Sequence, residues 1–264
     1  MPAHQDQYVG PRDLTRWSSP VGRFLVRCVR PLARWIGPHA ALLLLIAVGG
    51  GVAAALTAAS AEVYESVVER NGVAALDQPA LDLAVSLRED WFNAFITGYT
   101  NIGGPIGMPV LAISIMVLLA VRRRSWTPVI LLPAAAFGSL LMTVAGKDAI
   151  GRLRPPIGLA VPPYESSPSF PSGHSLNAIV IAGIVAYLLV VRQNRRRARG
   201  ITIIVAILFA VTMGLSRVYL GHHWLTDVLV AWTLGIAWLA VVITAHRLFL
   251  TFRLHRAALR ETRA

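Results

Sequence analysis

Charged side chains are scarce in this 264-residue chain: 14% of its residues are charged, whereas 55% are hydrophobic. A soluble globular domain carries about 25% charged residues. The mean hydropathy of +0.60 agrees with this excess of apolar residues. The composition therefore excludes an ordinary soluble domain. It indicates an integral membrane protein whose length suits one bundle of about six spans with short tails.

Cysteine is almost absent, because Cys28 is the only one. A single thiol excludes an intrachain disulfide and a cysteine metal cluster, and its place in the N-terminal tail argues against a catalytic thiol. Lysine is equally rare, since Lys147 is the only one of the 25 basic residues that is not an arginine. This single ammonium group suggests a specific need at that position, and a chance lysine is the alternative.

Long apolar runs predict an all-α membrane protein with six transmembrane helices. The first run could be mistaken for a signal peptide, because Ala59-Ser60-Ala61 resembles a cleavage site. The preceding tail is long and the apolar core is extended, so we interpret this run as a retained anchor. The six predicted spans are Ala40–Ser60, Pro105–Val121, Ser125–Gly146, Ser172–Val191, Gly200–Leu215 and Val228–Ala245.

The same runs divide the chain into one membrane domain over residues 40–247 and two basic tails, 1–39 and 248–264. The first tail contains a predicted surface helix around Val21–Ile36. We find neither an internal repeat nor a case for a second domain.

A polar and mostly acidic segment, Ala61–Gly104, separates the first two spans. Its polar and apolar residues recur at helical spacing on different sides. This pattern predicts an amphipathic helix at the outer interface, anchored by Trp91, and an ordinary leg of the next span is the alternative. The polar positions are Asp82, Ser86, Asp90, Asn93 and Thr97, and the apolar positions are Leu81, Val85, Phe92, Phe95 and Tyr99.

The distribution of basic residues predicts the orientation in a plasma membrane. The two tails, the adjoining Arg247 and two arginine-rich turns, 122–124 and 192–199, hold 19 of the 25 basic residues. The positive-inside rule therefore places both termini in the cytoplasm, and it accounts for the net charge of +12 without a nucleic-acid partner. Six cations remain on the outer side, where the rule disfavours them, namely Arg70, Arg88, Lys147, Arg152, Arg154 and Arg217.

Three polar segments at the outer ends of the last four spans carry most of these outer cations. Lys147, Arg154 and Arg217 place three cations on one rim, which suits a phosphate group. Ser172 and the N–H of Gly173 can complete an oxyanion cradle at a helix start. No carboxylate cluster or Cys/His set is present for a divalent metal, so we expect neither a metal nor another cofactor. The segments are 147–155, 171–174 and 216–227.

Two histidines are candidates for bond making and breaking. His223 and Asp227 share a face if they lie on a helix, so the carboxylate can fix the imidazole tautomer and leave the other nitrogen as a nucleophile. His174 is then the natural general acid. Each feature alone has a structural explanation, but their combination on one side favours a catalytic site. We interpret four further residues as structural or supporting, although His222 could compete with His223: Asp148, Arg152, Glu165 and His222.

The three segments resemble the signature of the type-2 phosphatidic acid phosphatase superfamily, whose pattern is Lys-x6-Arg-Pro, Pro-Ser-Gly-His and Ser-Arg-x5-His-x3-Asp. Every element of that pattern is present between residues 147 and 227. The resemblance implies that His223 forms a phosphohistidine, that Asp227 orients it and that His174 protonates the leaving group. It also implies that five residues hold the phosphate: Lys147, Arg154, Ser172, Gly173 and Arg217.

The expected protein is a metal-independent hydrolase that releases phosphate from a membrane lipid phosphate or diphosphate by double displacement at the outer face. Polyprenyl diphosphate is the preferred substrate, because carrier-lipid diphosphate is released on that face; phosphatidylglycerol phosphate and phosphatidic acid are alternatives. Two other functions stay open. One is a lipid phosphotransferase, and the other is a non-catalytic lipid carrier or flippase. The sequence does not indicate an oligomeric state.

Overall fold

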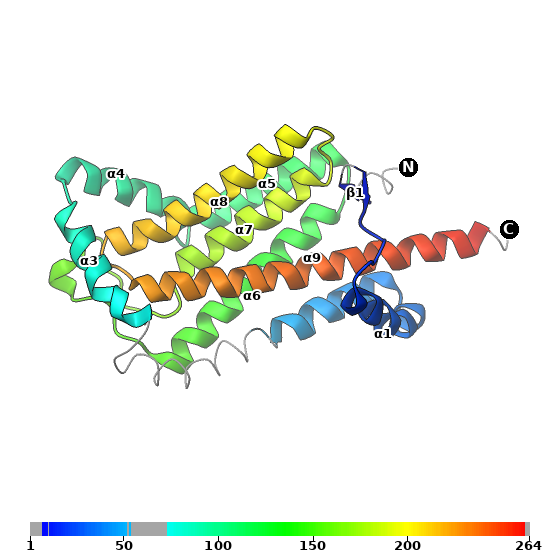
Figure 1. Cartoon of the computed structure of the whole chain (residues 1–264), viewed down its shortest axis with the longest axis horizontal. Coiled ribbons are helices and arrows are strands. Elements are labelled where there is room, and N and C mark those ends of the chain that lie inside the picture. Colours follow the sequence, from blue (N-terminus) through cyan, green and yellow to red (C-terminus); the bar gives the residue numbers. More distant parts are fainter. Residues whose placement is uncertain (1–6, 10, 52, 54–72, 262–264) are drawn as a thin grey trace.

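The computed structural model describes residues 7–9, 11–51, 53 and 73–261. Within them the chain forms a bundle of long helices and one small hairpin, in which β1 (Tyr8–Val9) pairs antiparallel with β2 (Arg12–Asp13) (Figure 1). The α-helices are α1 (Pro20–Ile36), an apolar helix over Pro38–Gly51, α3 (Asp77–Ser86), α4 (Asp90–Thr100), α5 (Gly107–Arg123), α6 (Thr127–Ile150), α7 (Gly173–Val190), α8 (Arg196–Tyr219) and α9 (Leu225–Glu261). Short 3₁₀ turns are η1 (Val73–Leu76), η2 (Asn101–Gly103) and η3 (Ile157–Leu159).

Residues with special backbone preferences mark the helix ends. Ser19 precedes α1 and accepts a hydrogen bond from the N–H of Gly22 at 3.1 Å, and Pro20 occupies the first helical position. Gly151 ends α6 in the left-handed region, with φ of 59°. The helical class is therefore confirmed, and the predicted surface helix around Val21–Ile36 corresponds to α1.

Four of the described helices, α6, α7, α8 and α9, are long and apolar enough to cross a membrane. A fifth span results if Asp90–Gly103 and Gly107–Arg123, which meet at 53°, are counted together. The first predicted span is represented by the shorter helix Pro38–Gly51, and its second half lies outside the described residues, as do residues 61–72. The count of six spans remains a prediction.

The amphipathic helix expected between the first two spans is not one continuous helix, because the chain breaks between α3 and α4, and its place at the outer interface stays a prediction. Arg88 lies at this break and turns toward the bundle. Its Nε and Nη2 donate to the carbonyl of Tyr219 at 3.0 and 2.7 Å, and its Nη1 donates to the carbonyl of Leu159 at 2.6 Å. The guanidinium thus binds the carbonyl of the last residue of α8 and that of the last residue of η3.

The polar turn expected over 216–227 is shorter than predicted. Helix α8 continues to Tyr219 and α9 begins at Leu225, so Arg217 lies on one helix and Asp227 on the other. Similarly, α6 extends to Ile150 and includes Lys147 in its last turn. These helix ends hold the polar side chains more firmly than loops would.

The two segments expected to be cytoplasmic tails pack against each other. Helix α9 runs without interruption into the region expected to be the second tail. Arg247 donates from Nε to the carbonyl of Leu14 at 2.9 Å and lies over the ring of Trp17, 4.3 Å from its centroid. Trp17 in turn donates from Nε1 to Thr251 at 3.1 Å. The N-terminal segment is therefore fixed to α9.

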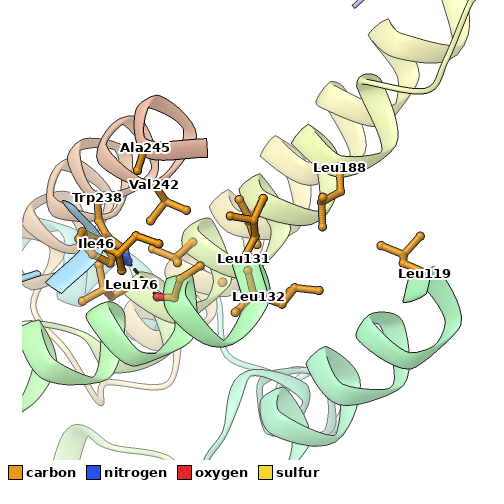
Figure 2. Close-up of a cluster of buried hydrophobic side chains, with 14 of the residues drawn as sticks. Ile46, Leu119, Leu131, Leu132, Leu176, Leu188, Trp238, Val242 and Ala245 are labelled. Carbon is orange, nitrogen blue, oxygen red and sulfur yellow. Dashed lines mark hydrogen bonds between the residues drawn. The ribbon is translucent and has the colours of Figure 1, made fainter. Parts of the chain in front are cut away.

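Helix α7 occupies the centre of the bundle and packs against α6, α8 and α9. Leu176 and Ile184 of α7 are fully buried in the main apolar cluster. Trp238 of α9 enters the same cluster and donates from Nε1 to the carbonyl of Ala135 at 3.0 Å (Figure 2). This core joins the helices whose ends carry the polar segments. Those segments lie near α3, at the end of the bundle opposite β1 and the last turns of α9 (Figure 1).

The close contact between α6 and α9 predicts that position 138 tolerates no side chain larger than that of glycine. A Cβ there would lie 2.2 Å from Cε2 of Trp238, so Gly138→Ala should force the buried indole to move. Overpacking of this kind costs about 1–3 kcal/mol, which corresponds to a decrease of about 2–12 °C in the thermal midpoint in detergent. Gly98→Ala is the matched control, because nothing lies within 4 Å of its Cβ position. Equal midpoints for both variants would contradict tight packing at Gly138.

Candidate active site

Helix ends bring the three polar segments together at one end of the bundle. Lys147 lies in the last turn of α6, and Arg154 follows in the loop after it. His174 lies in the first turn of α7, Arg217 in the last turn of α8, and Asp227 in the first turn of α9. Residues predicted from separate motifs therefore lie at the same end of the bundle.

Glu165 lies between two of the predicted phosphate-binding cations. Its Oε2 is 2.7 Å from Nη2 of Arg154, and its Oε1 pairs with Nη2 of Arg217. Burial alone would raise the pKa of Glu165, but Arg217 and Arg154 lower that pKa to about 2. A carboxylate thus occupies the position between two guanidinium groups that an oxyanion would use. The sequence interpretation of Glu165 as structural or supporting did not predict this position between the two arginines.

Arg154 and Arg217, together with Lys147 at their edge, form a group that we call the cation cluster. The ammonium of Lys147 binds the neighbouring loop instead of the carboxylate of Glu165. Its Nζ donates to Ser167 Oγ at 2.8 Å and to the carbonyl of Pro168 at 2.5 Å. Arg154 reaches the same loop, because its Nε donates to the carbonyl of Ser167 at 2.7 Å. Burial lowers the pKa of Arg154, and Glu165 opposes that effect. The two cations are thus positioned by the loop that carries Glu165.

Arg217 is held inside the bundle with only 2% of its side chain exposed. Its Nη1 donates to Thr100 Oγ1 at 3.1 Å, which gives α4 a part in positioning the guanidinium. Among the described residues, its Nε has no hydrogen-bond partner and is buried. A buried donor without an acceptor is costly, so an additional oxygen ligand would be favourable there.

His223 is paired with Asp227 as the sequence predicted. Its Nδ1 lies 3.5 Å from Asp227 Oδ2, and its Nε2 lies 3.2 Å from Nη1 of Arg154. A guanidinium only donates, so Nε2 must accept and the ring proton resides on Nδ1. Burial lowers the pKa of His223 to about 4, although Asp227 opposes this effect. The imidazole is therefore neutral near pH 7, with an unprotonated nitrogen directed at the cation cluster.

Asp227 is fully buried and accepts hydrogen bonds from groups that the sequence interpretation did not assign to it. Ser169 Oγ donates to Oδ2 at 2.5 Å, the N–H of Trp224 donates to Oδ2 at 3.0 Å, and Arg152 Nη1 donates to Oδ1 at 2.5 Å. Ser169 carried no sequence signal, because it lies in an irregular loop. Arg152 was visible only as one more cation on the disfavoured side.

The segment 171–174 leads into α7, which begins at Gly173. Ser172 is buried, and its hydroxyl lies 2.7 Å from that of Ser175. The hydroxyl is thus engaged within the first turn of α7 and does not bind the cations. Gly173 is the first residue of α7, where a helix leaves its N–H without an intrahelical partner. His174 lines a cavity of about 440 Å³ together with Glu165 and Arg217. The structure thus places His174 and the two charged groups around one space.

The two adjacent histidines differ in their partners. His222 donates from Nε2 to the carbonyl of Val161 at 2.7 Å, whereas His223 faces Asp227. Gly221 permits the turn before them, since it has φ of 71° and a Cβ there would lie 2.4 Å from the carbonyl oxygen of Leu159.

Of the other residues interpreted as structural, Asp148 lies exposed on α6. Within the described ranges, no group of three or more His, Cys, Asp and Glu side chains forms a metal-binding cluster.

The chain is similar to known membrane phosphatases. Residues 127–250 match the family described as the PAP2 superfamily. Phosphatidylglycerophosphatase B of Bacillus subtilis (strain 168) is 34% identical over 175 residues, which cover 66% of this chain and 85% of that protein. An undecaprenyl-diphosphatase of Sulfolobus acidocaldarius is 32% identical over 139 residues, or 51% of this chain and 62% of that protein.

A crystal structure shows the same architecture. It is that of the first transmembrane PAP2 type phosphatidylglycerolphosphate phosphatase from Bacillus subtilis, with a TM-score of 0.61 and 30% sequence identity. The alignment covers 78% of this chain and 93% of the other.

The position of Glu165 predicts competition with oxyanions. Glu165→Gln should bind inorganic phosphate about 5- to 20-fold more tightly than the unmodified protein, because the anion no longer has to displace a carboxylate from Arg154 and Arg217. Titration calorimetry and the phosphate-induced rise in thermal midpoint measure this. Glu89→Gln removes an exposed carboxylate and is the control. Unchanged or weaker phosphate binding by Glu165→Gln would contradict the competition.

Proposed function

Because this chain belongs to the PAP2 superfamily and is a membrane-bound lipid phosphatase, we propose that it removes the terminal phosphate of phosphatidylglycerol phosphate through a phosphohistidine intermediate on His223. One observation carries the proposed chemistry. The unprotonated Nε2 of His223 lies 3.2 Å from Arg154, whose other nitrogen pairs with Glu165 in the cation cluster. A nucleophile and an oxyanion site therefore adjoin.

In the first step the substrate phosphate replaces Glu165. Its non-bridging oxygens accept hydrogen bonds from Arg154, from Arg217 including its unpartnered Nε, and from the N–H of Gly173. Lys147 adds positive charge from the rim. The lone pair on His223 Nε2 then attacks phosphorus while the bond to the lipid oxygen breaks, and His174 donates a proton to that oxygen. The products are the lipid alcohol and a phosphorylated imidazole.

In the second step water resolves the intermediate. His174, now neutral, takes a proton from a water molecule as that oxygen attacks phosphorus, and the bond to His223 Nε2 breaks. Inorganic phosphate leaves and His174 is protonated again. Throughout, Asp227 holds the Nδ1 proton of His223 and stabilises the positive charge that the ring acquires on phosphorylation.

The cavities support a substrate that stays in the bilayer. The cavity of about 440 Å³ beside His174 shares Gly104 and Pro105 with an apolar groove of about 510 Å³ between α5, α6 and α7. Ile113 and Leu140 of that groove are largely exposed on the outer face of the bundle, where lipid chains would surround them. A charged headgroup can therefore occupy the first cavity while an acyl chain follows the groove.

The choice of headgroup rests on the similar proteins. Phosphatidylglycerophosphatase B covers more of this chain and matches more closely than the undecaprenyl-diphosphatase does, and the similar crystal structure is also of a phosphatidylglycerolphosphate phosphatase. Polyprenyl diphosphate, which the sequence interpretation preferred, is the second candidate because of its named relative. We propose that the site faces outward and both termini face the cytoplasm, since most basic residues lie at the opposite end.

A substrate panel in detergent tests this function. We expect phosphate release from phosphatidylglycerol phosphate to exceed that from polyprenyl diphosphate and phosphatidic acid in kcat/KM. We also expect activity to persist in excess EDTA, because the guanidinium and ammonium groups neutralise the phosphate. Loss of activity in EDTA with recovery in Mg²⁺ would contradict metal-independent chemistry. Transfer to an alcohol acceptor without phosphate release would instead indicate a phosphotransferase, and transport without turnover would indicate a carrier.

Replacement of the nucleophile should separate binding from turnover. His223→Ala should lower phosphate release by at least about 1,000-fold, because no other group forms the covalent intermediate, while lipid binding survives. His39→Ala is the control, since His39 lies on the helix Pro38–Gly51 and contacts Phe249 instead of the cation cluster. Substantial residual hydrolysis by His223→Ala would refute the assignment of the nucleophile.

A further inference from the structure

Arg152 connects two buried carboxylates that come from distant parts of the chain. Its Nη1 donates to Asp227 Oδ1 at 2.5 Å, and its Nη2 donates to Asp77 Oδ2 at 2.8 Å. Side-chain exposure is 14% for Arg152, 7% for Asp77 and zero for Asp227. The family pattern specifies neither Arg152 nor Asp77. Arg152 falls at an open position of Lys-x6-Arg-Pro, and Asp77 lies outside the matched segments.

The two oxygens of Asp227 have separate tasks. Oδ2 faces His223 and also accepts hydrogen bonds from the hydroxyl of Ser169 and the N–H of Trp224. Oδ1 accepts a hydrogen bond from Arg152. A carboxylate held at both oxygens cannot rotate about its last bond, so the contact at Oδ1 helps to determine where Oδ2 lies relative to the imidazole.

Asp77 fixes the other half of the guanidinium. Its Oδ1 accepts the N–H of Thr226 at 2.8 Å, and its Oδ2 accepts the hydroxyl of Thr226 at 2.7 Å. Asp77 is thereby attached to the first turn of α9, one residue before Asp227. The negative charge of Asp77 also partly neutralises the guanidinium. Arg152 therefore neutralises Asp227 less completely, and the Asp227 carboxylate can still stabilise positive charge on His223. The ring of Trp224 covers the guanidinium, with its centroid 5.4 Å from Cζ.

We propose that Arg152, held in place by Asp77, is a positioning residue that fixes the rotation and charge of Asp227 and thereby the orientation of His223. Arg152 acts through Asp227 and does not touch the substrate phosphate. The inference rests on the proposed function, because it requires that Asp227 orients a catalytic His223.

The kinetic test uses charge variants of both partners. Arg152→Gln should lower kcat by about 10- to 100-fold, the usual cost of removing the outer partner of a functional group, and leave KM within about 2-fold. Asp77→Asn should lower kcat less, since Arg152 can still reach Asp227. A KM increase that accounts for the whole loss of kcat/KM would place Arg152 on the substrate and overturn the proposal.

The pH dependence of kcat/KM distinguishes a positioning role of Arg152 from a purely structural one, because a purely structural role would not shift it. The acid limb of kcat/KM requires neutral His223. Arg152→Gln removes a positive charge beside Asp227, so the pKa of His223 rises and the limb moves to higher pH. Asp77→Asn removes a negative charge, so the limb moves to lower pH. The other charged or titratable groups around this pair are unchanged in both variants: Lys147, Arg154, Glu165, His174, Arg217 and His222.

Arg88→Gln is the matched control, because its half-buried guanidinium bonds only to backbone carbonyls in the contacts described above. It should lower the thermal midpoint without moving the acid limb. Wild-type kcat in Arg152→Gln, or a lower kcat with an unmoved acid limb, would overturn the proposal.

A conservative variant covers the case in which Arg152→Gln does not fold. Arg152→Lys keeps the charge but loses the two-pronged contact, so we expect kcat to fall by at least about 5-fold at an unchanged KM and an unmoved acid limb. Wild-type kcat in this variant would also overturn the proposal. Active wild-type protein with inactive His223→Ala shows that the function stands, so a failure at Arg152 would then concern this inference alone.

Discussion

Buried positive charge at the end of an apolar bundle is the constraint on which this site depends. Arg217 is almost wholly enclosed and Arg154 is largely enclosed, and a guanidinium in such surroundings is strongly disfavoured without an anion. Glu165 supplies that anion in the free protein. A phosphate group has the charge and the oxygen atoms to replace it. The fold therefore requires one anion between these arginines, and the identity of that anion distinguishes the free protein from the proposed complex.

The loop that carries Glu165 is anchored on both sides of it. Before Glu165, the N–H of Val161 donates to the carbonyl of Leu220 at 2.9 Å, and Arg88 binds the carbonyl of Leu159. After it, the N–H of Ser169 donates to the carbonyl of Arg152 at 2.8 Å. Ser169 also reaches Asp227, so the same loop contributes to the cation cluster and to the histidine pair. Helix ends and this loop thus form one connected polar network.

The sequence predicted the helical bundle and the convergence of its motifs because both leave local signals. Apolar runs are long, Arg217 lies where the positive-inside rule disfavours it, and His223 and Asp227 are spaced for contact. The break at Arg88 was not predicted, since the polar spacing continues across it and the contacts of Arg88 with α8 and η3 leave no signal in the sequence. Glu165 was undervalued because an irregular loop has no periodicity that indicates where a side chain points. For the same reason the sequence alone could not show that Arg152 joins Asp227 to a distant carboxylate.

The tether of Glu165 has a consequence for the end of the reaction. A carboxylate attached through an anchored loop stays close to Arg154 and Arg217 even after it has been displaced, so it returns at a high effective concentration. In the proposed reaction, the phosphate left after departure of the lipid alcohol is no longer connected to the bilayer and must compete with that intramolecular anion. In the proposed cycle, the contact that neutralises the empty site therefore also favours release of the product phosphate.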